Sequence, residues 1–185
     1  MSRNVRLLIE FDGADFFGWQ RQPNIRTVEG VLTKTIASFV QHEVRLATTS
    51  RTDRGVHALG LPVGFATNMD ISEYGLMRGL NSTLPEDVKV HEVKFMPDEW
   101  RVRYSAVAKT YLYRYQIGTM PMPLWRRRSH HIKRPDLDVD AMIAAAPLFE
   151  GVHDFGAFRA AKCQATLTTR QIHSSLVRRT SDPAI

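Results

Sequence analysis

Apolar residues along the first hundred positions follow two different periods. Four runs have the buried or alternating character of strands, and they cover residues 5–11, 43–49, 62–67 and 88–96. Residues 28–40 instead repeat apolar side chains at helical spacing behind Thr27, a residue suited to an N-cap. Residues 72–80 predict a second helix by the same criterion. The predicted order is strand, helix, strand, strand, helix, strand.

This order predicts an α+β fold with a ferredoxin-like, or RRM-like, βαββαβ lobe. Such a lobe has a four-stranded antiparallel sheet with two helices on one face. Its other face is expected to stay open, and RNA-recognition modules hold bases on such a face.

The second half predicts fewer elements. A long strand is expected over 104–117, a helix over 138–149 and a strand over 169–179, with a basic, Pro-rich loop after the first of them. We interpret residues 1–100 as one lobe and 101–185 as a second, incomplete lobe that shares an antiparallel sheet with the first.

Composition narrows the class of protein. The chain has 185 residues, 43% of them hydrophobic, which is typical of a folded globular protein. No run of apolar residues is long enough for a membrane span, and the N-terminus does not resemble a secretion signal. One cysteine, Cys163, excludes an internal disulfide framework and suits a reducing compartment, so we expect a cytoplasmic protein. The histidine spacing gives no metal-binding motif, and we expect no metal.

The net charge of +6 is unevenly distributed. The first hundred residues hold 11 basic and 13 acidic residues, whereas 101–135 hold nine basic residues and no acidic one. A segregated positive face favours a nucleic-acid partner, although a basic surface kept for solubility is the alternative. Aromatic residues between these charges could stack on bases or pack in a sheet: Trp100, Tyr104, Tyr111, Tyr113, Tyr115 and Trp125.

The stretch RTDRGVH, residues 51–57, gathers the side chains best suited to chemistry between two expected strands. An ionised Asp53 beside Arg51 could act as a base or a nucleophile. The alternative is a structural Asx-turn in which Asp53 caps amides and pairs with Arg51. His57 fits a packed, hydrogen-bonded histidine better than a catalytic one.

Five ordered segments resemble the TruA family of pseudouridine synthases, the tRNA pseudouridine(38–40) synthases. They are IEFDGADFFGWQRQ (9–22), RTDRGVHALG (51–60), NSTLPEDVKV (81–90), RYSAVAKTYLYRY (103–115) and GVHDFGAFRAAKCQ (151–164). Because they cover nearly the whole chain in the family's order, the resemblance is specific.

The resemblance implies an isomerase that converts uridine to pseudouridine in the anticodon arm of tRNA, without a cofactor and as a homodimer. It implies that Asp53 is the essential catalytic carboxylate, that Arg51 pairs with it and helps to flip the base, and that Tyr111 stacks on the uracil. Trp19 is expected to be structural. Basic residues expected to contact RNA phosphates are Arg21, Arg126, Arg127, Arg128, Lys133, Arg159 and Lys162.

The family continues well beyond residue 185. We therefore expect its C-terminal part to be missing, with impaired activity and a tendency to associate through exposed apolar surface and strand edges. A non-catalytic RNA-binding module of the same fold is the main alternative. A hydrolytic nuclease using Asp53 and His57 fits poorly, because no second acidic cluster could hold metal ions.

Overall fold

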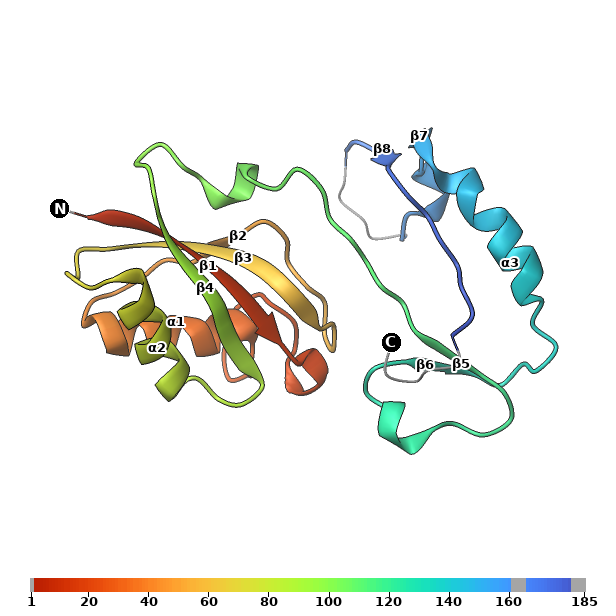
Figure 1. Cartoon of the computed structure of the whole chain (residues 1–185), viewed down its shortest axis with the longest axis horizontal. Coiled ribbons are helices and arrows are strands. Elements are labelled where there is room, and N and C mark those ends of the chain that lie inside the picture. Colours follow the sequence, from red (N-terminus) through yellow and green to blue (C-terminus); the bar gives the residue numbers. More distant parts are fainter. Residues whose placement is uncertain (1, 161–165, 181–185) are drawn as a thin grey trace. The chain divides into compact units, whose positions relative to one another are not determined.

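A four-stranded antiparallel sheet organises the first part of the chain, whose computed structural model describes residues 2–160 and 166–180 (Figure 1). Its strand order is β2-β3-β1-β4, formed by β1 (Arg3–Phe11), β2 (Ala47–Thr48), β3 (Ala58–Thr67) and β4 (Val88–Met96). With one helix before β2 and one before β4, this is the predicted α+β, ferredoxin-like βαββαβ lobe. The fold-class prediction is confirmed.

Both helices cover one face of this sheet, as Figure 1 shows. The Thr27 hydroxyl caps α1 (Val28–Val40) by accepting the Gly30 amide, and Ser72 caps α2 (Glu73–Thr83) in the same way. Alternate residues of the strands meet the apolar faces of the helices in one core. Each fully buried aliphatic side chain stabilises the fold by roughly 1.5–3 kcal/mol. The fully buried members include Val5, Leu7, Ile9, Leu32, Ile36, Val63, Leu76, Leu80 and Val88.

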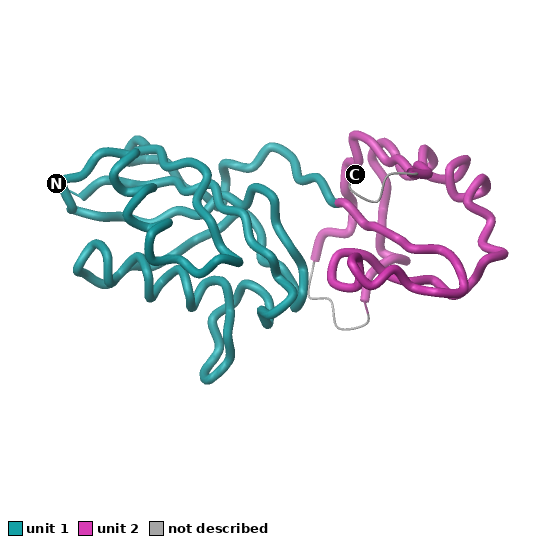
Figure 2. Tube along the Cα trace, turned by 60° about the horizontal axis from the view of Figure 1, so that its bottom comes forward, with its two compact units in different colours: residues 1–111 teal, residues 112–185 magenta. Residues whose placement is uncertain are grey.

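The other face of the sheet is partly covered, which corrects the expectation of an open face. A Cβ atom at Gly64 in β3 would lie 3.1 Å from the side chains of both Trp100 and Val102. Val102 is buried there, at the start of the short 3-10 turn Val102–Tyr104. Residues after β4 therefore pack on the sheet instead of beginning a new lobe. The compact units in the structure are Met1–Tyr111 and Leu112–Ile185 (Figure 2).

The strand expected over 43–49 is much shorter in the structure. Only Ala47 and Thr48 pair with β3, opposite Gly64 and Val63. Pro62 stands opposite Thr49 and has no N–H with which to extend this ladder beyond Thr48, whereas residues 43–46, at the other end, belong to no strand. The Thr48 hydroxyl donates to the Pro62 carbonyl instead, over 2.8 Å.

Side chains of α2 bond to the backbone of β4. The Asn81 amide donates to the Val90 carbonyl over 2.7 Å and accepts the Val90 amide over 2.9 Å. Glu73 accepts the Phe95 amide over 2.7 Å. A register shift between β1 and β4 near Val90 explains why apolar residues alternate imperfectly along β4.

The second unit contains smaller sheets than expected. Strand β5 (Tyr115–Ile117) pairs in parallel with β6 (His130–Ile132), and β7 (Gly151–Asp154) pairs antiparallel with β8 (Thr169–Ile172). The prediction of one long strand over 104–117 is wrong, because only Tyr115–Ile117 form a strand there. The prediction that the last strand extends to residue 179 is also wrong, because it ends at Ile172. A shared antiparallel sheet is not among the sheets of the described residues. Alternating aromatic residues favour a strand, but they do not supply the neighbouring edge that a strand must pair with.

The helix expected over 138–149 is formed in two parts. Asp138 caps α3 (Val139–Ala145), accepting the Ala141 amide over 2.9 Å, and a 3-10 turn continues over Ala146–Phe149. Pro147 ends the α-helix because it lacks an amide hydrogen and clashes with the preceding turn.

The second unit has little interior of its own. In the part of it that the structure describes, Ala146 is the only buried apolar residue. Large apolar side chains there are exposed instead, including Tyr113, Leu124, Leu148, Phe158 and Leu176. Most of the burial that stabilises the described chain therefore lies in the first unit. No helix within residues 2–160 and 166–180 is both long and apolar enough to cross a membrane.

Replacing Asn81 by Ala should lower the free energy of unfolding by about 1–3 kcal/mol, since the half-buried Val90 amide and carbonyl lose their side-chain partner. Urea unfolding followed by circular dichroism measures the change. Asn68→Ala is the matched control, because Asn68 is exposed and its side chain bonds to none of the described residues. Equal stability of the two variants would contradict this prediction.

Candidate active site

Residues 49–57 form the connection between β2 and β3 and carry the RTDRGVH stretch. Asp53 is exposed, and its carboxylate makes no hydrogen bond or ion pair with the residues that the structure describes. The turn after it is closed by backbone atoms, with the Val56 amide donating to the Asp53 carbonyl over 3.2 Å. The Asx-turn alternative is therefore wrong, and the carboxylate is available for other contacts.

Arg51 is exposed as well, and its guanidinium has no ion pair within the described part of the chain. The pair between Arg51 and Asp53 that the resemblance implied is not formed in this structure. Two exposed, oppositely charged groups thus lie two residues apart on one loop. They can both reach a bound molecule without first breaking a contact with each other.

Backbone hydrogen bonds fix this loop against the segment that follows β1. The Trp19 amide donates to the Thr52 carbonyl over 3.0 Å, and the Gly55 amide donates to the Phe16 carbonyl over 3.2 Å. Phe16 and Trp19 are themselves buried in the core, with 1% and 3% of their surface exposed. Trp19 is buried, as expected for a structural residue, and the loop is attached to residues of the hydrophobic core.

Two glycines let these backbones approach. A Cβ atom at Gly13 would lie 1.9 Å from the Val56 carbonyl oxygen, and one at Gly18 would lie 2.6 Å from the Thr52 oxygen. Gly18 also has a φ angle of +82°, which side chains rarely tolerate. Any other residue at either position would push the Asp53 loop away.

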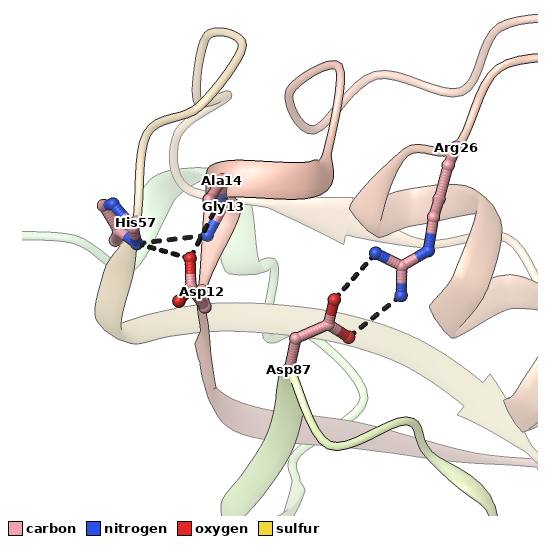
Figure 3. Close-up of polar contacts among 6 residues, drawn as sticks. All are labelled: Asp12, Gly13, Ala14, Arg26, His57 and Asp87. Carbon is pink, nitrogen blue, oxygen red and sulfur yellow. Dashed lines mark hydrogen bonds and ion pairs between the residues drawn. The ribbon is translucent and has the colours of Figure 1, made fainter. Parts of the chain in front are cut away.

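His57 closes the end of the loop with a polar contact, drawn in Figure 3. Its Nδ1 atom lies 3.0 Å from Asp12 Oδ1 and 3.2 Å from the Gly13 amide nitrogen. The same Asp12 oxygen accepts the Ala14 amide over 3.0 Å. With 32% of its side-chain surface exposed, His57 is the half-buried, hydrogen-bonded histidine that was expected.

An ion pair secures the other end of the 12–26 segment, as Figure 3 also shows. The two terminal nitrogens of Arg26 donate to the two carboxylate oxygens of Asp87 over 2.7 and 2.9 Å. Hydrogen bonding to Asp87 is the main reason that the pKa of Arg26 is raised. The guanidinium carbon lies 4.0 Å from the centre of the Phe16 ring. The Asp12 amide also donates to the Asp87 carbonyl over 3.0 Å, so the three segments 9–22, 51–60 and 81–90 are in contact.

Neither Asp12 nor Asp87 was singled out from the sequence. Both residues lie in segments that resemble the family. The resemblance identified these segments, but it did not predict that Asp12 contacts His57 or that Asp87 pairs with Arg26. A cation next to Asp53 was also missed: the Arg54 guanidinium carbon lies 4.0 Å from the centre of the Phe17 ring. Spacing along the chain carries no signal for contacts between distant segments.

The remaining candidates lie on exposed positions. Tyr111, the last residue of the first unit, has 69% of its surface exposed, and its side chain has no hydrogen-bond or ring partner in the described residues. Lys162 lies outside the described residues.

No group of three or more metal-ligating side chains occurs within 2–160 and 166–180. The exposed basic candidates are Arg21, Arg126, Arg127, Arg128, Lys133 and Arg159.

A family model described as "tRNA pseudouridine synthase" matches residues 7–105, which is more than half of the chain. The chain belongs to the tRNA pseudouridine synthase family. The matched residues include the Asp53 loop and both segments that hold it, and they end before Tyr111. The resemblance seen in the sequence is confirmed.

Relatives of this pseudouridine synthase family match almost the whole chain. A tRNA pseudouridine synthase A of Geobacter sp. (strain M21) is 42% identical over 172 residues, covering 93% of this chain and 69% of the relative. One of Burkholderia thailandensis is 38% identical over 178 residues, covering 96% and 66%. The chain thus spans about two thirds of the length of the curated relatives it matches.

Gly18→Ala should destabilise the lobe more than Gly55→Ala. Both glycines have positive φ angles, +82° and +79°, so each alanine costs about 1–2 kcal/mol in backbone strain. A Cβ atom at Gly55 meets nothing within 4 Å, whereas one at Gly18 strikes the Thr52 backbone and should cost about 1–3 kcal/mol more. Urea unfolding of the two variants measures the difference, and equal losses would show that the close approach is not a constraint.

Proposed function

We propose that this chain isomerises uridine in tRNA to pseudouridine, with the Asp53 carboxylate as the essential catalytic group. The observation that carries the proposal is an exposed carboxylate without a partner in the described residues, on a loop that backbone contacts hold in place. Membership of the pseudouridine synthase family supports the reaction. The relatives are tRNA pseudouridine synthases, which supports tRNA as the substrate.

The conversion of uridine to pseudouridine requires few protein groups besides an accessible carboxylate such as that of Asp53. The bond between N1 and C1′ breaks, the uracil turns, and C5 joins C1′; C5 loses a proton to solvent and N1 gains one. Substrate and product are isomers, so no redox cofactor is needed. A carboxylate can attack the ribose or the uracil, or remove a sugar proton, and each route needs it ionised and accessible.

Arg51 and Tyr111 complete the proposed site. Arg51 helps to hold the target nucleotide out of its stack, which costs unstacking energy that contacts with the protein must offset. Tyr111 stacks on the uracil. Both side chains are exposed, so neither role requires the folded lobe to break an existing contact.

We propose that basic side chains outside the Asp53 loop contact the RNA. The Asp53 loop belongs to the unit Met1–Tyr111, and the basic RNA-binding face is proposed mainly for the unit Leu112–Ile185. The substrate is the anticodon arm of tRNA at positions 38–40, and the protein acts in the cytoplasm as a homodimer. Side chains proposed to contact phosphates are Arg21, Arg126, Arg127, Arg128, Lys133, Arg159 and Lys162.

Replacing Asp53 by Ala should reduce pseudouridine formation by at least about 100-fold while tRNA affinity stays within about twofold, because the group acts in chemistry and not in phosphate binding. A transcript labelled with tritium at uracil C5 gives the readout, since that tritium is released when C5 bonds to carbon. Binding is measured separately by filter retention.

Asp70→Asn is the matched control, because Asp70 is an exposed acid of the same lobe with no proposed role. An active Asp53→Ala variant would remove the proposed mechanism. Tight tRNA binding without tritium release from the unaltered chain would favour the non-catalytic RNA-binding module.

Tyr111→Phe should keep most of the activity, whereas Tyr111→Ala should lose about 1–3 kcal/mol of base stacking, or roughly 5- to 150-fold in kcat/KM. The tritium-release assay at low tRNA concentration measures this ratio. Tyr113→Ala, at the neighbouring exposed tyrosine, serves as the control. Equal losses in Tyr111→Phe and Tyr111→Ala would show that the hydroxyl, and not the ring, is required.

A further inference from the structure

We propose that His57 is a positioning residue, which holds the Asp53 loop in its reactive shape through Asp12 and Gly13. The inference rests on the proposed role of Asp53. His57 lies four residues after Asp53, directly before β3 begins at Ala58. Its contacts with Asp12 and Gly13 join the downstream end of the loop to the end of β1.

His57 Nδ1 has a partner of each kind in the 12–13 segment, an acceptor in Asp12 and a donor in Gly13. When Nδ1 carries a proton, it can donate to Asp12 Oδ1 over 3.0 Å. When it does not, it can accept the Gly13 amide over 3.2 Å.

The upstream end of the loop is fixed independently. The Thr52 carbonyl, next to Asp53, accepts the Trp19 amide over 3.0 Å. Asp53 therefore lies between three attachments to residues 12–19: backbone hydrogen bonds at Thr52 and Gly55, and the side-chain contact of His57. Only the side-chain attachment can be removed by substitution without altering the backbone.

Asn and Gln distinguish positioning from imidazole chemistry. The side-chain amide of Asn begins at the same Cγ as the imidazole, so its Oδ1 or Nδ2 can occupy the place of Nδ1 and either accept or donate. The amide of Gln lies one bond farther out. If His57 acts through Nδ1, His57→Asn should preserve the contact and His57→Gln should not.

We expect His57→Ala and His57→Gln to lower kcat for tRNA by about 100-fold with KM changed less than about threefold, because misplacement of a reacting group affects chemistry more than binding. His57→Asn should stay within about tenfold of the unaltered chain. The thermal midpoint should shift by less than about 4 °C, since the contact is partly exposed.

A second measurement does not depend on catalysis. Amide hydrogen exchange followed by NMR reports the loop directly through Trp19 and Gly55, whose amides donate to the Thr52 and Phe16 carbonyls. We expect His57→Ala to speed their exchange at least about tenfold, while the Val90 amide in β4 is unaffected. His91→Ala is the matched control, since His91 makes a similar contact with Glu10, over 2.7 Å, away from the loop.

The outcomes separate the two proposals. Faster exchange at Trp19 and Gly55 in His57→Ala, with recovery in His57→Asn, supports positioning even if the chain shows no turnover. Unchanged exchange, or equal loss of activity in the Asn and Gln variants, overturns it. Full activity of Asp53→Ala would overturn the proposed function while leaving the exchange result intact.

Discussion

The approach of two backbones at Gly13 and Gly18 is the constraint on which the candidate site depends. At these positions the segment after β1 lies closer to residues 52–56 than any side chain would permit. The approach allows the Phe16 carbonyl and the Trp19 amide to bond to the loop while their side chains remain in the core. A polar, exposed loop thereby acquires the rigidity of the buried sheet beneath it, which is how a single carboxylate can be placed accurately on a surface.

Charged residues around the loop divide into two groups. Arg26 and Asp87 pair with each other, and His57 contacts Asp12, so these four form a frame that holds backbone segments together. Arg51 and Asp53 have no ion pair within the described residues, although both lie on the held loop. The four paired side chains hold the backbone segments in place, whereas the side chains of Arg51 and Asp53 face solvent. This is the distribution expected where a site must be formed before its ligand arrives, because little reorganisation then opposes binding.

Sequence periodicity was sufficient for the first lobe because α1, α2, β1 and β4 each bury one face in a common core, so local pattern and tertiary contacts agree. It failed over 104–117, where alternating aromatics gave the pattern of a strand but no neighbouring strand satisfies it beyond β5. It also overextended β2, of which only Ala47 and Thr48 pair with β3. For the candidate site, the motif predicted a role for Asp53, but the contacts of Asp12 and Asp87 join residues tens of positions apart and had no signature in spacing.

The bonds from Asn81 and Glu73 to β4 also bear on self-association. A strand at the border of a sheet normally offers its free amides and carbonyls to any extended chain that arrives. Here the Val90 and Phe95 positions of that border are already occupied by side chains of the protein's own helix. An incoming strand would have to displace them, so lengthening of the sheet on this side, whether by another copy or by a misfolded peptide, is disfavoured.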